Sequence, residues 1–340
     1  MSSRLQPETT KSSGPVRRWL KYAFYDWTRE MPKSKRFFTW IGILIQGYAI
    51  WAGISHSLMW PIMWPHGFSL YFCVWLLYVI GSGMMNAMLT SEFLRKTQFE
   101  SDQIAAQQIQ KTLQPEKLEE MPGYKMEVFY QPYRAVSGDY FDVIELPANQ
   151  TLFAVADVSG KGMPAALLAA NIQALVRSLA NVDADPLALA RQINNHLNRY
   201  TPSNRFATAV FIRLNRDSGE LTYVNAGHNA PILFSAGSAM SLAPTGMPIG
   251  LLSGADYEAG TAVIPFGGSL LIFTDGLTDA LPDSIRGSDP EGRLRNAITD
   301  DPAKTMLNLK SLIDPKLSED DVTILLVKRV AASVSIGARE

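Results

Sequence analysis

The chain contains a single cysteine among its 340 residues. One cysteine cannot form an internal disulfide, and Cys73 lies in an apolar stretch without a neighbour that would activate a thiol. A cysteine-dependent phosphatase is excluded as well, because the sequence has no Cys-x5-Arg nucleophile loop. We therefore interpret Cys73 as an apolar residue of a membrane segment or of a core.

Charged residues are also scarce, at 19% of the chain, where about a quarter is usual. The net charge is −1, so the overall charge does not favour nucleic acid as a partner, and we predict none. The deficit is local, because residues 37–60 and 68–89 contain no Asp, Glu, Lys or Arg. Each block has about the 20 residues that a helix needs to cross a bilayer.

These two blocks predict a transmembrane helical hairpin over residues 37–89, with spans at about 38–60 and 68–89. The connection contains two prolines and a glycine, which suit a reversal of the chain, and tryptophans lie at the block ends. A buried hairpin in a soluble domain is the alternative. His56 and Gln46 are the residues least suited to lipid, and both could face the partner helix.

The distribution of basic residues predicts the orientation of the hairpin. Residues 1–36 form a basic N-terminal segment with nine Lys/Arg against three acids, Arg95 and Lys96 follow the second span, and the connection has neither Lys nor Arg. Because basic flanks stay on the cytoplasmic side, we predict a multi-pass protein of the bacterial inner membrane with both termini in the cytoplasm. The lipid bilayer is thus a predicted partner, and the short connection leaves no room for a large external sensor domain.

Residues 90–118 are predicted to link the membrane to the next domain, with a helix over residues 91–114 that ends at Pro115. The apolar stripe of this helix is narrow and includes Ile109 and Leu113. Such a stripe suits a helix that pairs with its own copy or one that docks on the following domain. We therefore predict a homodimer through this helix, and Ile109 and Leu113 are candidate regulatory residues.

Residues 119–330 change to short strands, turns and helices, and a tail follows at residues 331–340. Apolar runs bounded by turn residues predict strands, and proline-started segments predict helices. Strands are expected at 151–158, 207–214, 220–227, 268–276 and 321–329, and helices at 164–180 and 186–200, the second capped by Asp185. Because strands outnumber helices and hairpins are frequent, we predict an α+β fold of mainly antiparallel sheet with covering helices.

Four apolar segments of this region carry aspartates at their edges: Asp139 and Asp142, Asp157, Asp275, and Asp320 and Asp321. Charges rarely lie beside an apolar core without compensation, and Lys161 is the only cation close to them in sequence. Each motif alone is more typical of a turn. If the strands converge, a divalent cation is the simplest compensation, and oxygen ligands without His or Cys favour Mg²⁺ or Mn²⁺ over zinc.

A series of motifs between about residues 104 and 330 carries a family resemblance: AAQQIQKTLQP, SGDYFD, DVSGKGMPAALLA, FATAVFIRL, VNAGHNAP, MPIGLL, IFTDGLTDA and DDVTILLV. In this order the set resembles the bacterial metal-dependent serine/threonine protein phosphatases of the sporulation protein E type, which belong to the PPM superfamily. The resemblance does not cover the predicted hairpin. It implies an αββα sandwich, in which two antiparallel sheets face each other between outer helices.

The same resemblance implies a metal site and its chemistry. Asp157 would bridge two Mn²⁺ or Mg²⁺ ions, the carbonyl of Val158 would bind one of them, and Asp275 and Asp320 would bind the other. Asp139 matches a family acid that binds metal directly or through water. The two ions would activate a water that attacks the phosphoester, so that no protein nucleophile is needed.

Several further residues keep two interpretations. The acids Asp142, Asp279 and Asp321 could support the ligands or serve in turns, and Asp279 could start a helix. His228 could be a general acid or a histidine that fixes a loop, and Lys161 could draw in phosphate or be an exposed turn lysine. Tight turns around the metals are expected at four glycines: Gly138, Gly160, Gly162 and Gly276.

The predicted function is that of a membrane-anchored protein-serine/threonine phosphatase. By resemblance, its substrate would be a phosphorylated regulatory protein of the anti-sigma-factor antagonist kind. The alternative is a catalytically inactive scaffold that binds a phosphoprotein through the same surface. All expected acids are present, which favours the enzyme.

Overall fold

The computed structural model describes residues 44, 46–48, 50–55, 68–115, 118, 120–180, 184–202, 204–235, 237–282, 290–314 and 316–330. The chain divides into two compact units, Met1–Gln98 and Phe99–Glu340, and each is described by itself below. The basic segment 1–36, part of the predicted first span including His56, the whole connection between the predicted spans, and the tail 331–340 lie outside the described residues.

A long helix α4 (Phe68–Leu113) begins in the first unit, where it contains the whole of the predicted second span, and continues without a break into the predicted linker helix. The helical residues before it run antiparallel to its first part. Gln46 Nε2 donates to Ser82 Oγ at 2.8 Å, and Gln46 Oε1 accepts from Asn86 Nδ2 at 2.9 Å. Further along, a Cβ added to Gly53 would meet the Trp75 ring at 2.1 Å, so glycine permits this close approach. Gln46 thus faces the neighbouring helix, and the membrane location stays a prediction.

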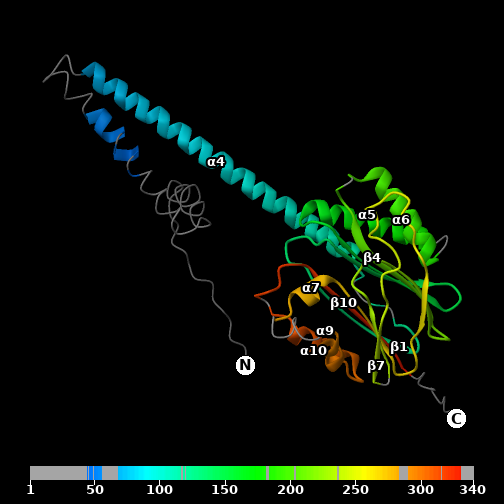
Figure 1. The fold of residues 1–340 in the computed structure, drawn as a ribbon. Coiled ribbons are helices and arrows are strands. Elements are labelled where there is room, and N and C mark those ends of the chain that lie inside the picture. The colour runs from blue at the N-terminus through cyan, green and yellow to red at the C-terminus, as the bar shows by residue number, and fades with distance from the viewer. Residues whose placement is uncertain are drawn as a thin grey trace, which may run out of the picture. The chain divides into compact units, whose positions relative to one another are not determined.

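Among the described residues, the second unit contains two antiparallel sheets of five strands each. Their strands are the arrows in Figure 1. Sheet A has the order β1-β10-β9-β6-β7, with β1 (Tyr124–Gln131), β10 (Val322–Arg329), β9 (Ser269–Phe273), β6 (Ile232–Ser235) and β7 (Ser238–Ser241). Sheet B has the order β2-β3-β4-β5-β8, with β2 (Asp139–Leu146), β3 (Gln150–Val158), β4 (Ala207–Asn215), β5 (Glu220–Ala226) and β8 (Gly260–Val263).

Alternate side chains of the central strands pack on opposite faces of their sheets. Phe153 and Val155 on β3 lie in the core between the two sheets, together with Leu325 and Val327 on β10. Their sequence neighbours face outward and are also buried, which explains why these strands read as continuous apolar runs. Each outer face is therefore covered by helices.

Helices cover both outer faces of the sandwich (Figure 1). Sheet B packs against α5 (Met163–Ala180) and α6 (Pro186–Tyr200), and sheet A packs against α9 (Pro290–Ala297) and α10 (Pro302–Leu312). The start of α6 agrees with the sequence, because the Asp185 carboxylate accepts from Ala188 N at 3.1 Å and proline opens the helix. The two-sheet arrangement with outer helices confirms the predicted fold of this domain.

Within the described residues, α5 is the one helix whose length and apolar composition would suffice to cross a bilayer. Its apolar side chains, including Ala165, Ile172 and Val176, are buried against sheet B. We therefore assign α5 to the core of the domain.

The structure corrects the expected strand at 268–276. Strand β9 ends at Phe273, and Asp275 opens a short helix α7 (Asp275–Asp279). Asp279 is the last residue of that helix, so the suggestion that it starts a helix is wrong. The sequence also left β1, α9, α10 and the short strands β6, β7 and β8 unpredicted. The strands β6, β7 and β8 have only four residues each, which is too brief for a clear periodic pattern.

Candidate active site

Aspartates from both sheets converge at one end of the sandwich. In sheet B, Asp139 at the start of β2 is the register partner of Asp157 near the end of β3. In sheet A, β9 and β10 are antiparallel neighbours, so the residues that follow β9 lie beside those that precede β10. Asp275, Asp320 and Asp321 are in these positions. We call Asp139, Asp157, Asp275, Asp320 and Asp321 the acid cluster.

Asp139 joins the two sheets through hydrogen bonds. Its Oδ2 atom accepts from the hydroxyl of Thr274, which follows β9, at 2.8 Å and from the hydroxyl of Thr323 on β10 at 2.5 Å. The side chain is buried, and burial together with the nearby charge of Asp157 raises the pKa of Asp139 well above its usual value. The two hydroxyls oppose this rise in the pKa by stabilising the carboxylate.

Asp157 lies at the centre of the like charges. Its pKa is raised to about 7 by burial first and then by the carboxylates of Asp275, Asp320 and Asp321, while Lys161 opposes the rise. The pKa of Asp275 is also raised, first by burial and then by Asp320. The acids that the sequence predicted as ligands are therefore close enough to repel one another.

Lys161 provides a cation at the edge of the acid cluster. Its Nζ atom lies 2.8 Å from Asp320 Oδ2 and donates to the Glu319 carbonyl at 2.6 Å. The ammonium group also lies 5.6 Å from the centre of the Tyr133 ring. Lys161 is thus more than a turn lysine in this structure, because it neutralises one of the predicted ligands.

Asp321 holds the loop that precedes Asp139. Its two carboxylate oxygens accept from the backbone N–H groups of Tyr133 and Gly138, each at 2.7 Å. Backbone donors of this kind position a loop and stabilise the charged carboxylate. The structure thus favours a supporting role for Asp321.

Asp142 does not join the acid cluster. It lies three residues after Asp139 on the same strand and therefore points to the opposite face, where Arg177 of α5 forms an ion pair with it. Arg177 Nε and Nη2 donate to the two carboxylate oxygens at 2.7 and 2.9 Å. Asp142 fixes α5 to β2, and it is placed away from the predicted ligands.

The four glycines near the cluster serve in two ways. Gly160 and Gly162 have φ values of +92° and +79°, which agree with the tight turns expected for them. Gly276 instead lies in the first turn of α7, where an added Cβ would stand 2.0 Å from the Asp321 carbonyl oxygen. An added Cβ at Gly138 would meet the Val158 carbonyl oxygen at 3.2 Å. Gly138 and Gly276 thus allow close backbone approach, and the expectation of tight turns is wrong for them.

His228 is buried between the sheets next to the strands that carry the acids. Its Nδ1 atom is 2.8 Å from the hydroxyl of Thr208, and Thr208 is the register partner of Asp157. Burial lowers the pKa of His228 to about 4, and the Phe273 backbone offsets part of that shift. Within the described chain no group lies in hydrogen-bond geometry with Nε2. A neutral, enclosed imidazole fits a role in holding the two sheets near the site better than a role as general acid.

The end of α4 contacts the loop that leads to Asp139, which agrees with the expectation that this helix could dock on the following domain. The Gln110 side chain donates to the Ser137 carbonyl at 2.7 Å and accepts from the Ser137 N–H at 2.9 Å. Gln173 on α5 donates to the Leu113 carbonyl. Ile109 and Leu113 themselves are exposed. The residues that dock this helix are therefore glutamines next to the predicted apolar stripe.

The acid cluster fits a divalent cation by its donor chemistry. Carboxylate and backbone oxygens are the ligands preferred by Mg²⁺ and Mn²⁺, and the mutual repulsion of the buried acids is what such an ion would relieve. Among the described residues, no three His, Cys, Asp or Glu side chains already stand in a ligating arrangement. Of the proposed ligands, Asp320 is the one already paired with a cation, Lys161.

Two face-to-face antiparallel sheets between helices, with aspartates from both sheets at one end, make up this domain. The fold matches the SiaA-PP2C domain of Pseudomonas aeruginosa with a TM-score of 0.59, 20% identity, and coverage of 70% of this chain and 99% of that one. Residues 147–330 match the family described as Stage II sporulation protein E (SpoIIE), and the chain belongs to this family.

Two curated relatives from Bacillus subtilis (strain 168) show how far the similarity extends. The phosphoserine phosphatase RsbU is 25% identical over 262 residues, which cover 74% of this chain and 77% of RsbU. The phosphoserine phosphatase RsbX is 32% identical over 153 residues, or 44% of this chain and 71% of RsbX. The chain spans 40% and 52% of two further curated relatives.

Proposed function

We propose that the protein is a metal-dependent protein-serine/threonine phosphatase with its active site at the acid cluster. The observation that carries this proposal is the convergence of Asp139, Asp157 and Asp275, whose pKa values are raised by burial and by neighbouring carboxylates, within a domain of the SpoIIE family. Perturbed carboxylates of this kind mark functional sites more often than structural ones. RsbU and RsbX are both named phosphoserine phosphatases, which supports the same reaction here.

The residues proposed to hold the ions are those predicted from the family pattern. Asp157 would be shared between two Mn²⁺ or Mg²⁺ ions, and Asp139, Asp275, Asp320 and the Val158 carbonyl would complete their ligands. A solved structure of RsbX is described as a complex with magnesium, which supports this cofactor class. When bound, the ions would supply an activated water for in-line attack and would neutralise the phosphoryl oxygens.

The chain's own residues would prepare this site in three ways. Thr274 and Thr323 orient Asp139, Asp321 fixes the loop before it, and His228 holds the neighbouring strand of sheet B. Lys161 is half-exposed at the edge of the cluster, where its charge can attract a phosphate group once it leaves Asp320.

The substrate class proposed is a phosphorylated regulatory protein, such as an anti-sigma-factor antagonist. It follows from the family membership and from the relatives named phosphoserine phosphatases.

The exposed apolar side chains of Ile109 and Leu113 support a homodimer through α4. Ile109→Asp should then reduce the mass measured by light scattering while metal binding is unchanged, and an unchanged mass would contradict the dimer contact.

We also propose that residues 37–89 anchor the protein in the bacterial inner membrane. The described part of this segment exposes large apolar side chains along α4, including Leu76, Ile80 and Met85. Fractionation tests the anchor: the full chain should sediment with membranes and resist alkaline carbonate extraction. Release into the supernatant by carbonate would rule out a membrane-spanning anchor.

The enzyme proposal is tested by phosphate release from phosphorylated candidate proteins in the presence of Mn²⁺ or Mg²⁺. We expect turnover by the natural chain, loss of at least about a hundredfold in Asp157→Asn because the shared ligand is weakened, and no loss in Asp256→Asn, where the aspartate is exposed. The alternative is an inactive phosphoprotein-binding scaffold. Binding of a phosphoprotein by the folded chain without any turnover would favour that scaffold.

A further inference from the structure

A polar cavity lies on sheet A at the end opposite to the acid cluster. Its volume is about 360 Å³, and its lining includes Ser269, Lys328 and Arg295. Ser269 is the first residue of β9 and Lys328 the penultimate residue of β10, whereas the acid cluster lies where β9 ends and β10 begins. The volume is within the range of small-molecule sites in proteins, about 300–1,000 Å³.

Lys328 is an unusual residue for its place in the sheet. It follows Ile324 and Leu326 on the outer face of β10, which is otherwise apolar, and its side chain is only 7% exposed. Buried lysines normally have a compensating partner that is buried with them. Here the acceptors are the Thr299 carbonyl at 3.3 Å and a carboxylate oxygen of Asp300 at 3.1 Å, and Asp300 is itself fully exposed.

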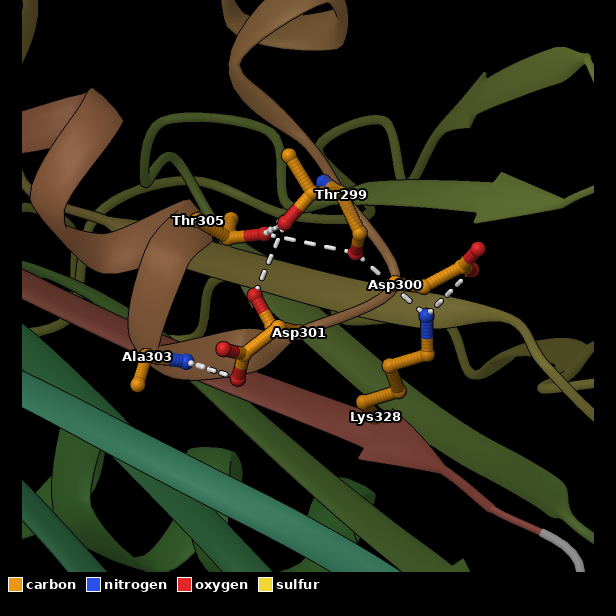
Figure 2. A network of polar contacts seen from close by, with 6 residues as sticks. All are labelled: Thr299, Asp300, Asp301, Ala303, Thr305 and Lys328. Atoms are coloured by element: carbon orange, nitrogen blue, oxygen red, sulfur yellow. Dashed lines mark hydrogen bonds and ion pairs between the residues drawn. The ribbon is translucent and has the colours of Figure 1, made fainter.

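The connection between α9 and α10 has its own bracing, as Figure 2 shows. Thr299 N–H donates to the Thr305 hydroxyl at 2.8 Å, the Thr299 hydroxyl donates to the Asp301 carbonyl at 2.8 Å, and the Asp301 carboxylate accepts from Ala303 N–H at 3.1 Å. These bonds fix the connection without Lys328. The ammonium group is therefore not needed to shape the loop.

Positive charge is concentrated around this cavity. Lys125 is the register partner of Lys328 on the neighbouring strand β1, and paired like charges on one sheet face are unfavourable. Arg295, in the last turn of α9, lines the same cavity. Asp300 is the acidic residue among the lining residues, so the cavity has an excess of basic groups.

The remaining lining suits a small phosphorylated molecule. Ser235, Ser238 and Ser269 contribute hydroxyl groups, which donate hydrogen bonds to phosphate oxygens. Phe234 and Ile298 contribute apolar surface for an organic portion. The β6–β7 turn at Gly237 has φ of +87° and no atom within 4 Å of an added Cβ, so this rim is open.

We propose that this cavity binds a phosphate group, free or carried by a small molecule, through Lys328 and Arg295. The bound phosphate would replace Asp300 as the partner of the Lys328 ammonium group and relieve the repulsion between Lys328 and Lys125. The serine hydroxyls would complete its hydrogen bonds. The site is separate from the acid cluster and does not depend on the phosphatase activity.

Calorimetric titration of the purified full chain with inorganic phosphate and with glucose 6-phosphate tests the proposal, in EDTA and at constant ionic strength. EDTA keeps divalent cations from the acid cluster, which then repels phosphate. We expect saturable binding of one or both probes, weakened about tenfold or more by Lys328→Met, which loses a charge-assisted hydrogen bond. Binding of inorganic phosphate alone would identify the free anion as the ligand class, and preference for the ester would identify a phosphorylated small molecule.

Arg295→Met provides a second variant, because Arg295 is exposed and its loss leaves the buried core intact. It should weaken binding too, while Lys304→Met, at an exposed lysine of α10, should not. Absence of saturable binding by the natural chain would overturn the proposal. So would binding that survives both Lys328→Met and Arg295→Met, or binding that is abolished by Asp157→Asn.

Discussion

Lys161 and Asp320 form an ion pair of 2.8 Å at the edge of the acid cluster, and both side chains are partly exposed. The pair places a protein cation on a carboxylate that is proposed as a metal ligand. A metal ion that binds Asp320 would therefore share the carboxylate with Lys161, whose positive charge opposes the binding of a second cation. Lys161 and the metal ion would thus compete for the negative charge of the Asp320 carboxylate.

Lys161→Met should consequently strengthen metal binding. A partly exposed ion pair contributes roughly 0.2–1 kcal/mol, so the affinity for Mn²⁺ should rise by at most about fivefold. Titration with Mn²⁺ followed by electron paramagnetic resonance measures the free ion directly. Lys316→Met, at an exposed lysine, is the control and should leave the affinity unchanged. Weaker Mn²⁺ binding by Lys161→Met would show that Lys161 supports the ion and does not compete with it.

His228 should make the folded domain sensitive to acid. Burial lowers its pKa from 6.5 to about 4, so between these pH values the unfolded chain binds a proton that the folded chain does not. The contribution of His228 to the free energy of unfolding therefore rises with pH across this window and falls on acidification, by about 3 kcal/mol at most.

Urea unfolding of metal-free protein at several pH values between 4 and 7 measures this dependence. His228→Gln removes the titrating group, so its stability curve should be flatter than that of the natural chain over the same window. His196→Gln, on the partly exposed face of α6, is the matched control and should keep the natural slope. Parallel curves for His228→Gln and the natural chain would refute the assignment.

The acids of the cluster were predictable because a charge at the end of an apolar strand is visible in the sequence. Asp142 shows where that pattern misleads. It lies an odd number of residues from Asp139 and so faces α5, which the alternation of a strand could have indicated. Thr274 and Thr323 could not be found in this way, because a threonine in a strand is ordinary until its partner across the sandwich is known.

At the scale of elements, α4 is connected to the acid cluster through the loop that precedes Asp139. Its Gln110 side chain binds both backbone groups of Ser137, and Ser137 precedes Gly138 and Asp139. The predicted boundary between membrane span and linker at residue 90 is not a break in the helix. The sequence changes there from apolar to polar residues. Such a change does not by itself end a helix.

Gln110→Ala should loosen the loop before Asp139. Two hydrogen bonds to a buried backbone are lost, and an unpaired buried group costs about 1–3 kcal/mol, so amide hydrogen exchange in residues 133–138 should accelerate. Mass spectrometry of peptides from this loop measures the effect. Gln107→Ala, at an exposed position of the same helix, is the control. Equal exchange rates in the two variants would mean that α4 does not restrain the loop.

At the scale of the domain, polar side chains join the two sheets at both ends of an apolar core. At the acid end, Asp139 of sheet B accepts from Thr274 and Thr323 of sheet A. At the other end, Arg329 of sheet A donates to carbonyls that flank the strands of sheet B, including Ser218 in the β4–β5 turn at 2.7 Å. The sandwich as a layer architecture was predicted, while these cross-connections depend on which strands end next to each other.

Arg329→Met should lower the stability of the sandwich without changing metal binding at the acid cluster. Arg329 is buried and donates to the carbonyls of Asp217, Ser218 and Ile264, at 2.6, 2.7 and 2.9 Å. Methionine keeps much of the apolar stem but leaves these carbonyls without their donor, which should lower the free energy of unfolding by roughly 2–4 kcal/mol. Metal affinity should stay unchanged in the folded variant, because Arg329 lies at the end of β10 far from the acid cluster.

Thr323→Val is the matched change at the other end. It removes one hydrogen bond to Asp139, raises the pKa of that buried carboxyl further, and should weaken metal binding in addition to reducing stability. Urea unfolding and Mn²⁺ titration of both variants measure the two effects separately. If Arg329→Met weakened metal binding as much as Thr323→Val, the hydrogen bonds of Arg329 would affect the acid cluster through the core, and the two ends of the sandwich would not act independently.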